Sequence, residues 1–259
     1  MKNTSIISLI LLLLSLLFGI SFSGCGYRGN GNVTVEKRQL GSFKTVVIDQ
    51  EGGMNGLTFG ENRMSTIELK LVHDTAEYAS IEYDENLMHH IKTETVNERL
   101  IIRTSKPLYS KRNIHVNIHY KHIEQIEASS LVDIVFANPY HGKTLSLNLS
   151  GASDLTGGIF ADELLLDVSG AADITLSGKL RKLQGDLSGA SDIQAYGLVT
   201  DTCMLNISGA GDAEVHVLNF LKVDVSGSAT VNYKGNPQVV KEISGAGDVE
   251  KAEADSLSQ

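Results

Sequence analysis

Aspartate recurs at a fixed place in the second half of the chain, where it is the residue type best suited to chemistry. If the segments that carry it stack, neighbouring carboxylates lie about 5 Å apart, near the spacing of carboxylate pairs in retaining glycosidases. A catalytic pair, however, is usually single, and unlike surroundings separate its two pKa values. Here the acid recurs in six of the seven copies, so turn structure is the favoured interpretation, ahead of cation binding and of catalysis. The six positions are Asp133, Asp154, Asp173, Asp192, Asp212 and Asp248. The candidate column for a cation or ligand is Asp154, Asp173, Asp192 and Asp212.

Histidine spacing raises a second chemical possibility, a metal site. His115 and His119 are four residues apart, which suits zinc only on a helix. Alternating apolar residues around them predict a strand, where that spacing is about 13 Å and too long for one ion. Cys203 falls at an inward apolar position, and no Ser-His-Asp or Cys-His arrangement is evident. The sequence therefore predicts no catalytic residue, no metal ligand and no cofactor.

The elements that position these residues form an internal repeat. A Ser-Gly-Ala phrase recurs at intervals of 18 to 20 residues, with a degenerate first copy at Ser129-Ser130. One copy, Ser226-Gly227-Ser228, is a variant. The glycines of the phrase predict tight corners, because glycine tolerates positive φ and close backbone approach. These glycines are Gly151, Gly170, Gly189, Gly209, Gly227 and Gly245.

Apolar residues alternate before each corner, as in Leu145, Leu147 and Leu149. This period of two is typical of a strand with one buried face. Equal phase in every copy predicts parallel stacking in register, which is the pattern of a β-solenoid. The fold prediction is therefore all-β: a parallel, right-handed β-helix of about seven 19-residue coils. An antiparallel sandwich is the alternative, since it also has short strands at regular spacing.

A second polar column occupies the outer face of the same strands, two residues before each serine. It is expected to be a solvated face, or a ladder that lies against a glycan or a partner protein. The column is Asn148, Asp167, Asp186, Asn206, Asp224 and Glu242.

The first half predicts an irregular β-domain that caps the open end of the repeats. Its expected strands are Val33–Val35, Thr45–Ile48, Ile67–Leu71, Arg99–Ile102 and Ile114–Ile118, with one helical turn over Asn86–Ile91.

The first residues read as an export signal of the lipoprotein type. Lys2 precedes an apolar run over 6–18 that is too short to span a bilayer. Gly24-Cys25 follows, so Cys25 is the predicted lipid-attachment residue. The predicted organisation is a signal peptide (1–24), a flexible tether (25–32), the β-domain (33–128), the repeats (129–250) and a polar tail (251–259). With Cys25 lipidated, Cys203 has no disulfide partner.

These features together resemble the putative auto-transporter adhesin, head GIN domain family of Bacteroidota. The resemblance covers roughly residues 29–250 and rests on the Ser-Gly-Ala-x-Asp-Ile repeats, Gly29-Asn30-Gly31-Asn32, Asp84-Glu85-Asn86-Leu87 and the lipidation motif. It implies a β-helical envelope protein with no established biochemical activity. The chain departs from the pattern at residues 52–56 and at Thr230, which replaces the acid of the sixth repeat.

Two functions follow as hypotheses. The first is a non-enzymatic lipoprotein, exported and lipid-anchored in the cell envelope, that acts as an adhesin-like binding or scaffold module. Its partners would be the membrane, through the lipid, and a glycan or envelope protein. The alternative is a carbohydrate-active β-helix that binds or cleaves glycans. A formal net charge of -9 argues against nucleic acid, whose phosphates need clustered Lys and Arg.

Cys25 is expected to carry a fatty acyl group in the cell. Metabolic labelling with a fatty-acid analogue should mark the natural chain and leave Cys25→Ser unmarked. Equal labelling of the two chains would contradict lipidation at this residue.

Overall fold

The structure, a computed structural model, describes residues 26–50 and 63–252. The predicted signal peptide, Cys25, the divergent segment 52–56 and most of the predicted polar tail lie outside these residues. The described chain is all-β, as predicted, with one short 3-10 helix, η1 (Glu85–His90), at the expected helical turn. No described helix is long and apolar enough to cross a membrane.

The strands of the first half include all five segments expected from sequence. They are β1 (Tyr27–Arg28), β2 (Val33–Gln39), β3 (Thr45–Gln50), β4 (Arg63–Met64), β5 (Ile67–His73), β6 (Tyr78–Asp84), β7 (Ile91–Val96), β8 (Arg99–Thr104), β9 (Leu108–Ser110) and β10 (Ile114–Tyr120).

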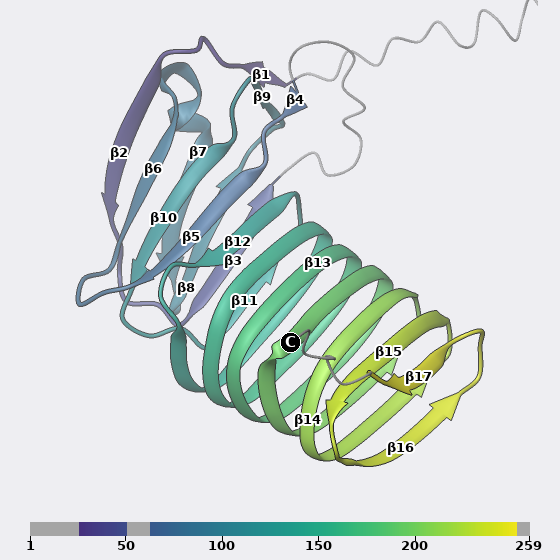
Figure 1. Cartoon of the computed structure of the whole chain (residues 1–259). Helices are drawn as coiled ribbons and strands as arrows, with labels where there is room; N and C mark the ends of the chain where they lie inside the picture. Colours follow the sequence, from purple (N-terminus) through teal and green to yellow (C-terminus); the bar gives the residue numbers. More distant parts are fainter. Residues whose placement is uncertain (1–25, 51–62, 253–259) are drawn as a thin grey trace, which may run out of the picture.

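The second half winds through strands of very different length, and the longest of them bend at the repeated corners (Figure 1). They are β11 (Gln125–Ala128), β12 (Val132–Phe136), β13 (Tyr140–Ile207), β14 (Ala210–Val225), β15 (Ser228–Gly235), β16 (Gln238–Ile243) and β17 (Asp248–Lys251).

Strand pairing in the second half is parallel and follows the repeat. Leu205 pairs with Val223, and Val223 pairs with Lys241, so each residue sits beside its equivalent in the next repeat. Beyond the corner, Ala213 pairs with Val231 in the same way. The sequence phase thus fixed the register, because a shift of one residue would turn every apolar side chain to solvent.

The parallel stacks do not stop where the Ser-Gly-Ala phrase stops. On one side β11 continues through β3 to β8, and on the other β12 continues through β5 to β10. Within this large sheet, pairing becomes antiparallel only at the outer described strands, where β7 joins β8 and β6 joins β10, with β2 beyond it. One mixed, 14-stranded sheet therefore runs through both halves, and its outer strands cover the N-terminal end of the stacks.

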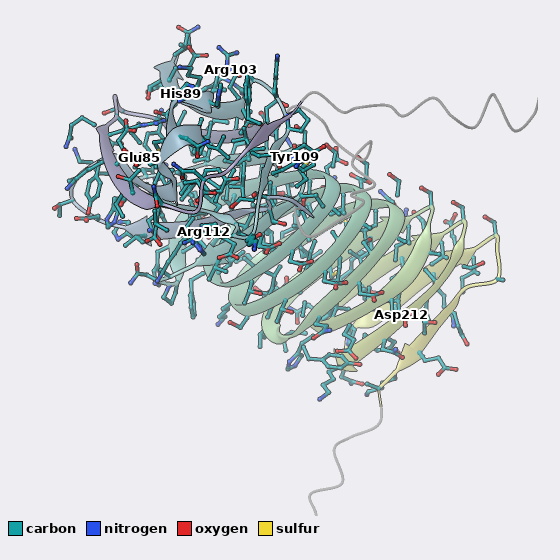
Figure 2. All side chains as sticks on the ribbon, turned by 90° about the horizontal axis from the view of Figure 1, so that it is seen from above. Glu85, His89, Arg103, Tyr109, Arg112 and Asp212 are labelled. Carbon is teal, nitrogen blue, oxygen red and sulfur yellow. The ribbon has the colours of Figure 1, made fainter. Side chains whose placement is uncertain are left out.

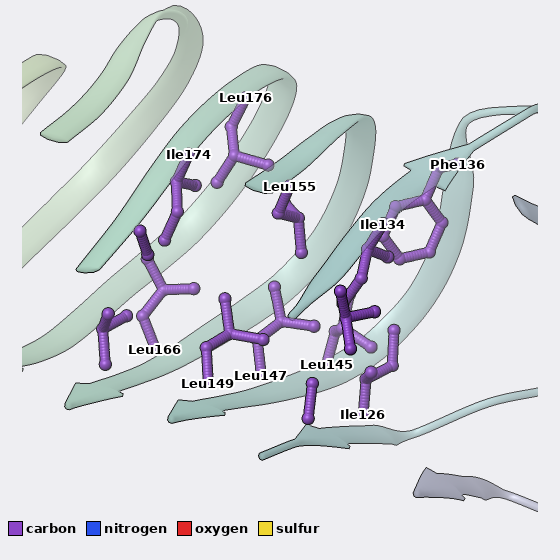
Figure 3. Close-up of a cluster of buried hydrophobic side chains, with 14 of the residues drawn as sticks. Ile126, Ile134, Phe136, Leu145, Leu147, Leu149, Leu155, Leu166, Ile174 and Leu176 are labelled. Atoms are coloured by element: carbon purple, nitrogen blue, oxygen red, sulfur yellow. The ribbon is translucent and has the colours of Figure 1, made fainter. Parts of the chain in front are cut away.

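The core is one continuous apolar column inside the stacked strands (Figure 3). Ile126, Leu147, Leu166 and Leu205 are each at most 2% exposed, as the alternation predicted. Gly185 breaks the series of large side chains, and Leu205 reaches toward the space beside it. The column ends at Lys241, which is exposed and donates a hydrogen bond from Nζ to the carbonyl of Val249 at 3.0 Å.

The corner glycines stack directly on one another from repeat to repeat. A Cβ on Gly170 would overlap the carbonyl oxygen of Gly151, and one on Gly189 would overlap that of Gly170. Gly189 also has a φ of +124°, but Gly170 does not have positive φ. Close backbone approach is therefore the requirement shared by the corners, while positive φ applies to only some of them.

The predicted flexible tether, 25–32, differs from what the structure shows over residues 26–32. Tyr27 and Gly29 donate backbone hydrogen bonds to the carbonyls of Pro107 (3.1 Å) and Tyr109 (2.9 Å). Asn86 then bonds both Asn30 N and Arg28 O. Glycine and asparagine suggest flexibility in isolation, but here they allow the segment to pack closely against the buried Asp84.

Alanine at Gly170 should destabilise the fold much more than alanine at Gly158. The added Cβ at Gly170 meets backbone that cannot move aside, which typically costs about 1–3 kcal/mol. At Gly158 the nearest atom to a Cβ is Pro139 Cβ at 3.5 Å, an ordinary contact, and the change should stay within about 0.5 kcal/mol. Urea melts of the two variants provide the measurement. Equal midpoints would mean that close approach does not constrain the corner.

Candidate functional site

A long, open groove follows the Ser-Gly-Ala side of the repeats. It consists of two hollows of about 510 and 460 Å³ that share Asp167. We call it the serine groove, because a serine from each of seven repeats lines it. These residues are Ser129, Ser150, Ser169, Ser188, Ser208, Ser226 and Ser244.

The serines are exposed, yet each is positioned by the corner that it begins. Ser208 and Ser226 donate backbone N–H groups to carbonyls of the preceding repeat, both at 2.8 Å. Several hydroxyls, including those of Ser150 and Ser188, donate to preceding carbonyls at 3.4 Å. These hydroxyl bonds are long, and the oxygen lone pairs remain able to accept hydrogen bonds. The column can therefore offer acceptors to a ligand at regular spacing.

The second wall of the serine groove is the outer polar column predicted from sequence. Asn148, Asp167, Asp186, Asn206, Asp224 and Glu242 all line it. The structure extends this wall into the first half through Val47, Asp49 and Glu127. Sequence reasoning did not include Val47 and Asp49, because the pairing of β3 with β11 is a property of the tertiary fold. Glu127 stands two residues before Ser129, so the spacing of the column could have indicated it.

Charge along the groove is partly balanced. Arg99 forms a two-pronged ion pair with Glu127 at one end, and Lys222 contacts Asp224 at 3.0 Å near the other. The hydrogen bond to Asp224 and its negative charge raise the pKa of Lys222. In the middle, Asn206 Nδ2 donates to Asp186 Oδ1 at 2.6 Å, and within the described residues no ion pair neutralises Asp167 or Asp186. The central groove is therefore acidic.

The aspartate column that opened the sequence argument lies beyond the corner, outside the serine groove. Two members bind the backbone of the next repeat: Asp192 Oδ1 accepts from Asp212 N at 2.9 Å, and Asp212 Oδ1 accepts from Thr230 N at 3.3 Å. These carboxylates link successive repeats where the strand ladder bends. They perform the structural work expected of a turn residue. Neither Asp154 nor Asp173 lines the two hollows.

The two histidines considered for metal binding, His115 and His119, and the neighbouring His122 each contact a different acid. Asp74 Oδ2 lies 2.8 Å from His119, Glu68 lies 2.7 Å from His115, and Glu124 lies 3.0 Å from His122. The hydrogen bond from His119 is the main cause of the lowered pKa of Asp74. Within 26–50 and 63–252 no three metal-ligating side chains come together.

Buried titratable groups belong to the core. Burial raises the pKa of Cys203 to about 12, and it raises the pKa values of Tyr83, Tyr120 and Tyr140 to about 12 as well. A thiol that stays protonated is a poor nucleophile. Cys203 thus behaves as a small apolar side chain, in agreement with its inward sequence position.

The sequence profile described as "putative auto-transporter adhesin, head GIN domain" matches residues 64–237. Comparison with curated proteins finds no match.

Solved structures from Bacteroidales share the fold. A putative adhesin from Bacteroides fragilis has a TM-score of 0.78 at 15% identity, covering 88% of this chain and 100% of that one. One from Parabacteroides merdae has a TM-score of 0.64 at 18% identity, with coverage of 88% and 99%. A putative lipid binding protein from Parabacteroides distasonis has a TM-score of 0.62 at 18% identity, with coverage of 87% and 99%.

The Cys203 thiol should resist modification while the protein is folded. At pH 8 a Cys25→Ser chain should react with an aromatic disulfide reagent on the order of 10³ times more slowly than the same chain in guanidinium, because thiolate is scarce in the fold. Absorbance of the released thiolate gives both rates. Similar rates would contradict the burial of this side chain.

Proposed function

Because the chain belongs to the putative auto-transporter adhesin, head GIN domain family, we propose that it is a non-enzymatic, adhesin-like module that binds an extended polar ligand along the serine groove. The observation that carries the proposal is the groove itself. It repeats the same serine and the same polar position over many repeats, so it offers equivalent contacts to a ligand with its own repeat.

A glycan or an extended segment of an envelope protein fits this surface chemically. Both present regularly spaced hydrogen-bond donors, and the groove supplies carboxylate, amide and hydroxyl oxygens as acceptors. The acidic centre at Asp167 and Asp186 further favours ligands that are neutral or positively charged. Many weak contacts in series can together give useful affinity, since the later contacts form at high local concentration.

The scaffold that we propose is a parallel, right-handed β-helix of about seven coils over residues 129–250. Parallel pairing of equivalent residues in successive repeats supports it. The nearly direct stacking of the corner glycines supports it further. Such a scaffold keeps the groove straight and rigid, which lowers the entropy lost when a long ligand binds.

We also propose that the protein is exported and held in the cell envelope by lipid on Cys25. The apolar run before Gly24-Cys25 supports this, as does membership of an adhesin family.

Glycan cleavage is the weaker alternative. Asp167 and Asp186 stand on neighbouring repeats and could in principle act as a carboxylate pair. Both are exposed on an open groove, with no enclosure that would give them unlike surroundings. The same groove is better suited to holding a glycan than to cutting it.

Charge reversal on the groove provides the test. A screen of immobilised glycans and envelope proteins first identifies a ligand. Asp186→Lys should then weaken binding at least about tenfold, because the new lysine repels a positively charged ligand and stands as an unpaired charge against a neutral one. Asp173→Lys makes the same charge change outside the groove and should leave the affinity nearly unchanged. If Asp173→Lys instead abolishes binding and Asp186→Lys does not, the aspartate column is the binding surface and our assignment is wrong.

A further inference from the structure

The residues that follow Cys25 are fixed to the body of the protein. Gly26 packs against Tyr109, and β1 pairs in parallel with β9 through Tyr27 and Arg28. Gly26, the residue that directly follows Cys25 in the sequence, is therefore held at this edge. A lipid on Cys25 would therefore bring this end of the body to the bilayer surface, with no free linker between them.

The surface around that edge is aromatic and basic. The Tyr27 ring stacks on the His90 ring with 3.7 Å between centroids, and the His89 ring lies 3.9 Å from the His90 ring, again between centroids. Lys106 Nζ lies 5.3 Å from the Tyr27 ring centroid. We call this surface the anchor face and define it by seven residues: Tyr27, Arg28, His89, His90, Lys92, Lys106 and Tyr109. Figure 2 shows His89 and Tyr109 on the N-terminal part of the molecule, with Asp212 far along the repeats.

The positive charges of the anchor face are poorly compensated. Arg28, Lys92 and Lys106 are exposed, and within the described residues none of them has a carboxylate at ion-pair distance. Among the acids of this end, Glu36 bonds Arg38 and also attracts Lys92, and Glu85 lies on η1. Burial lowers the pKa of His90, and the charges of His89, Lys92 and Lys106 lower it further, which shows that these cations crowd one another.

We propose that the anchor face lies flat against an anionic membrane surface beside the lipid on Cys25, and that it holds the repeats pointing away from the bilayer. This inference rests on the lipid anchor of the proposed function. Tyrosine side chains suit the interface between headgroups and water, and a basic patch adds to a lipid anchor on anionic bilayers. Figure 1 places β1 and β9 at the opposite end of the molecule from β16 and β17, so the far coils and the groove would extend outward.

Free phosphate offers the same charge as a lipid headgroup, but position favours the membrane. The anchor face adjoins the residue that carries the lipid, and its aromatic rings have no use in binding a small anion. The anchor face comprises seven side chains, whereas a phosphate ion could contact only a few of them.

Hydroxyl-radical footprinting of the lipidated full chain tests the proposal. The protein is inserted into vesicles of phosphatidylcholine alone or with added phosphatidylglycerol, and oxidation is measured at two tyrosines. Tyr27, which is 36% exposed, should be protected on the anionic vesicles relative to the neutral ones. Tyr196, on the repeats, should oxidise equally on both. Inorganic phosphate added without anionic lipid should give no protection of Tyr27.

Two pairs of Lys→Glu substitutions, one on the anchor face and one on the repeats, test whether the basic charges of the anchor face cause the protection of Tyr27. Each basic side chain near an anionic bilayer favours the bound orientation about fivefold, so Lys92→Glu with Lys106→Glu should lower the docked population by more than about tenfold and restore Tyr27 oxidation. The control, Lys143→Glu with Lys179→Glu, changes two exposed lysines on the repeats and should keep Tyr27 protected.

The outcomes separate the two proposals. A natural chain that stays on the vesicles but oxidises Tyr27 equally on both compositions overturns the anchor face alone. Protection by inorganic phosphate without anionic lipid overturns the membrane as its occupant. A chain that is retained on neither vesicle overturns the lipid anchor, and the anchor face with it.

Discussion

Close parallel stacking of backbone at the Ser-Gly-Ala corner is the contact on which the other features of this protein depend. There the chain of one repeat approaches the chain of the next so nearly that a single Cβ would overlap a carbonyl oxygen, as at Gly170 over Gly151. Because each repeat is held mainly by its neighbours, the corner must be equally tight in every copy. Glycine meets that demand, and the serine and aspartate on either side supply hydrogen bonds between repeats.

This close stacking produces the two faces of the repeat half, an apolar inner face and a polar outer face. Strands in register bring apolar side chains into one inner column, including Leu147, Leu166 and Leu205. The same register brings the outer polar residues and the corner serines into the serine groove. Core and groove are thus opposite sides of one strand pattern, so the groove is as regular as the core that supports it. Regularity of this kind favours an elongated ligand over a compact one.

The two ends of the stack are closed to further strand pairing in different ways. At the N-terminal end, the parallel ladders continue into β8 and β10 and are then covered by antiparallel strands. One of the two edge strands there, β2, carries Glu36, Lys37 and Arg38, charges that discourage further strand pairing. At the other end Lys241 takes the last inward position and turns its amine to a backbone carbonyl. The described C-terminal strands end there with exposed, charged side chains.

By itself the sequence determined the all-β class, the parallel register of the repeats, the inward column and the outer polar column. This was possible because the alternation of apolar and polar residues keeps the same phase relative to every Ser-Gly-Ala phrase. Stacking equivalent positions of successive repeats then gives the register without any further information. Only the tertiary structure decided that the stacks continue into the first half, where β3 and β5 carry no such phrase and long-range pairing assigns their partners. It also decided that residues 26–32 dock, since their contacts come from Asn86 and Tyr109, far along the chain. The groove joins Asp49 to Glu127 for the same reason: adjacency between distant segments is set by packing, not by local pattern.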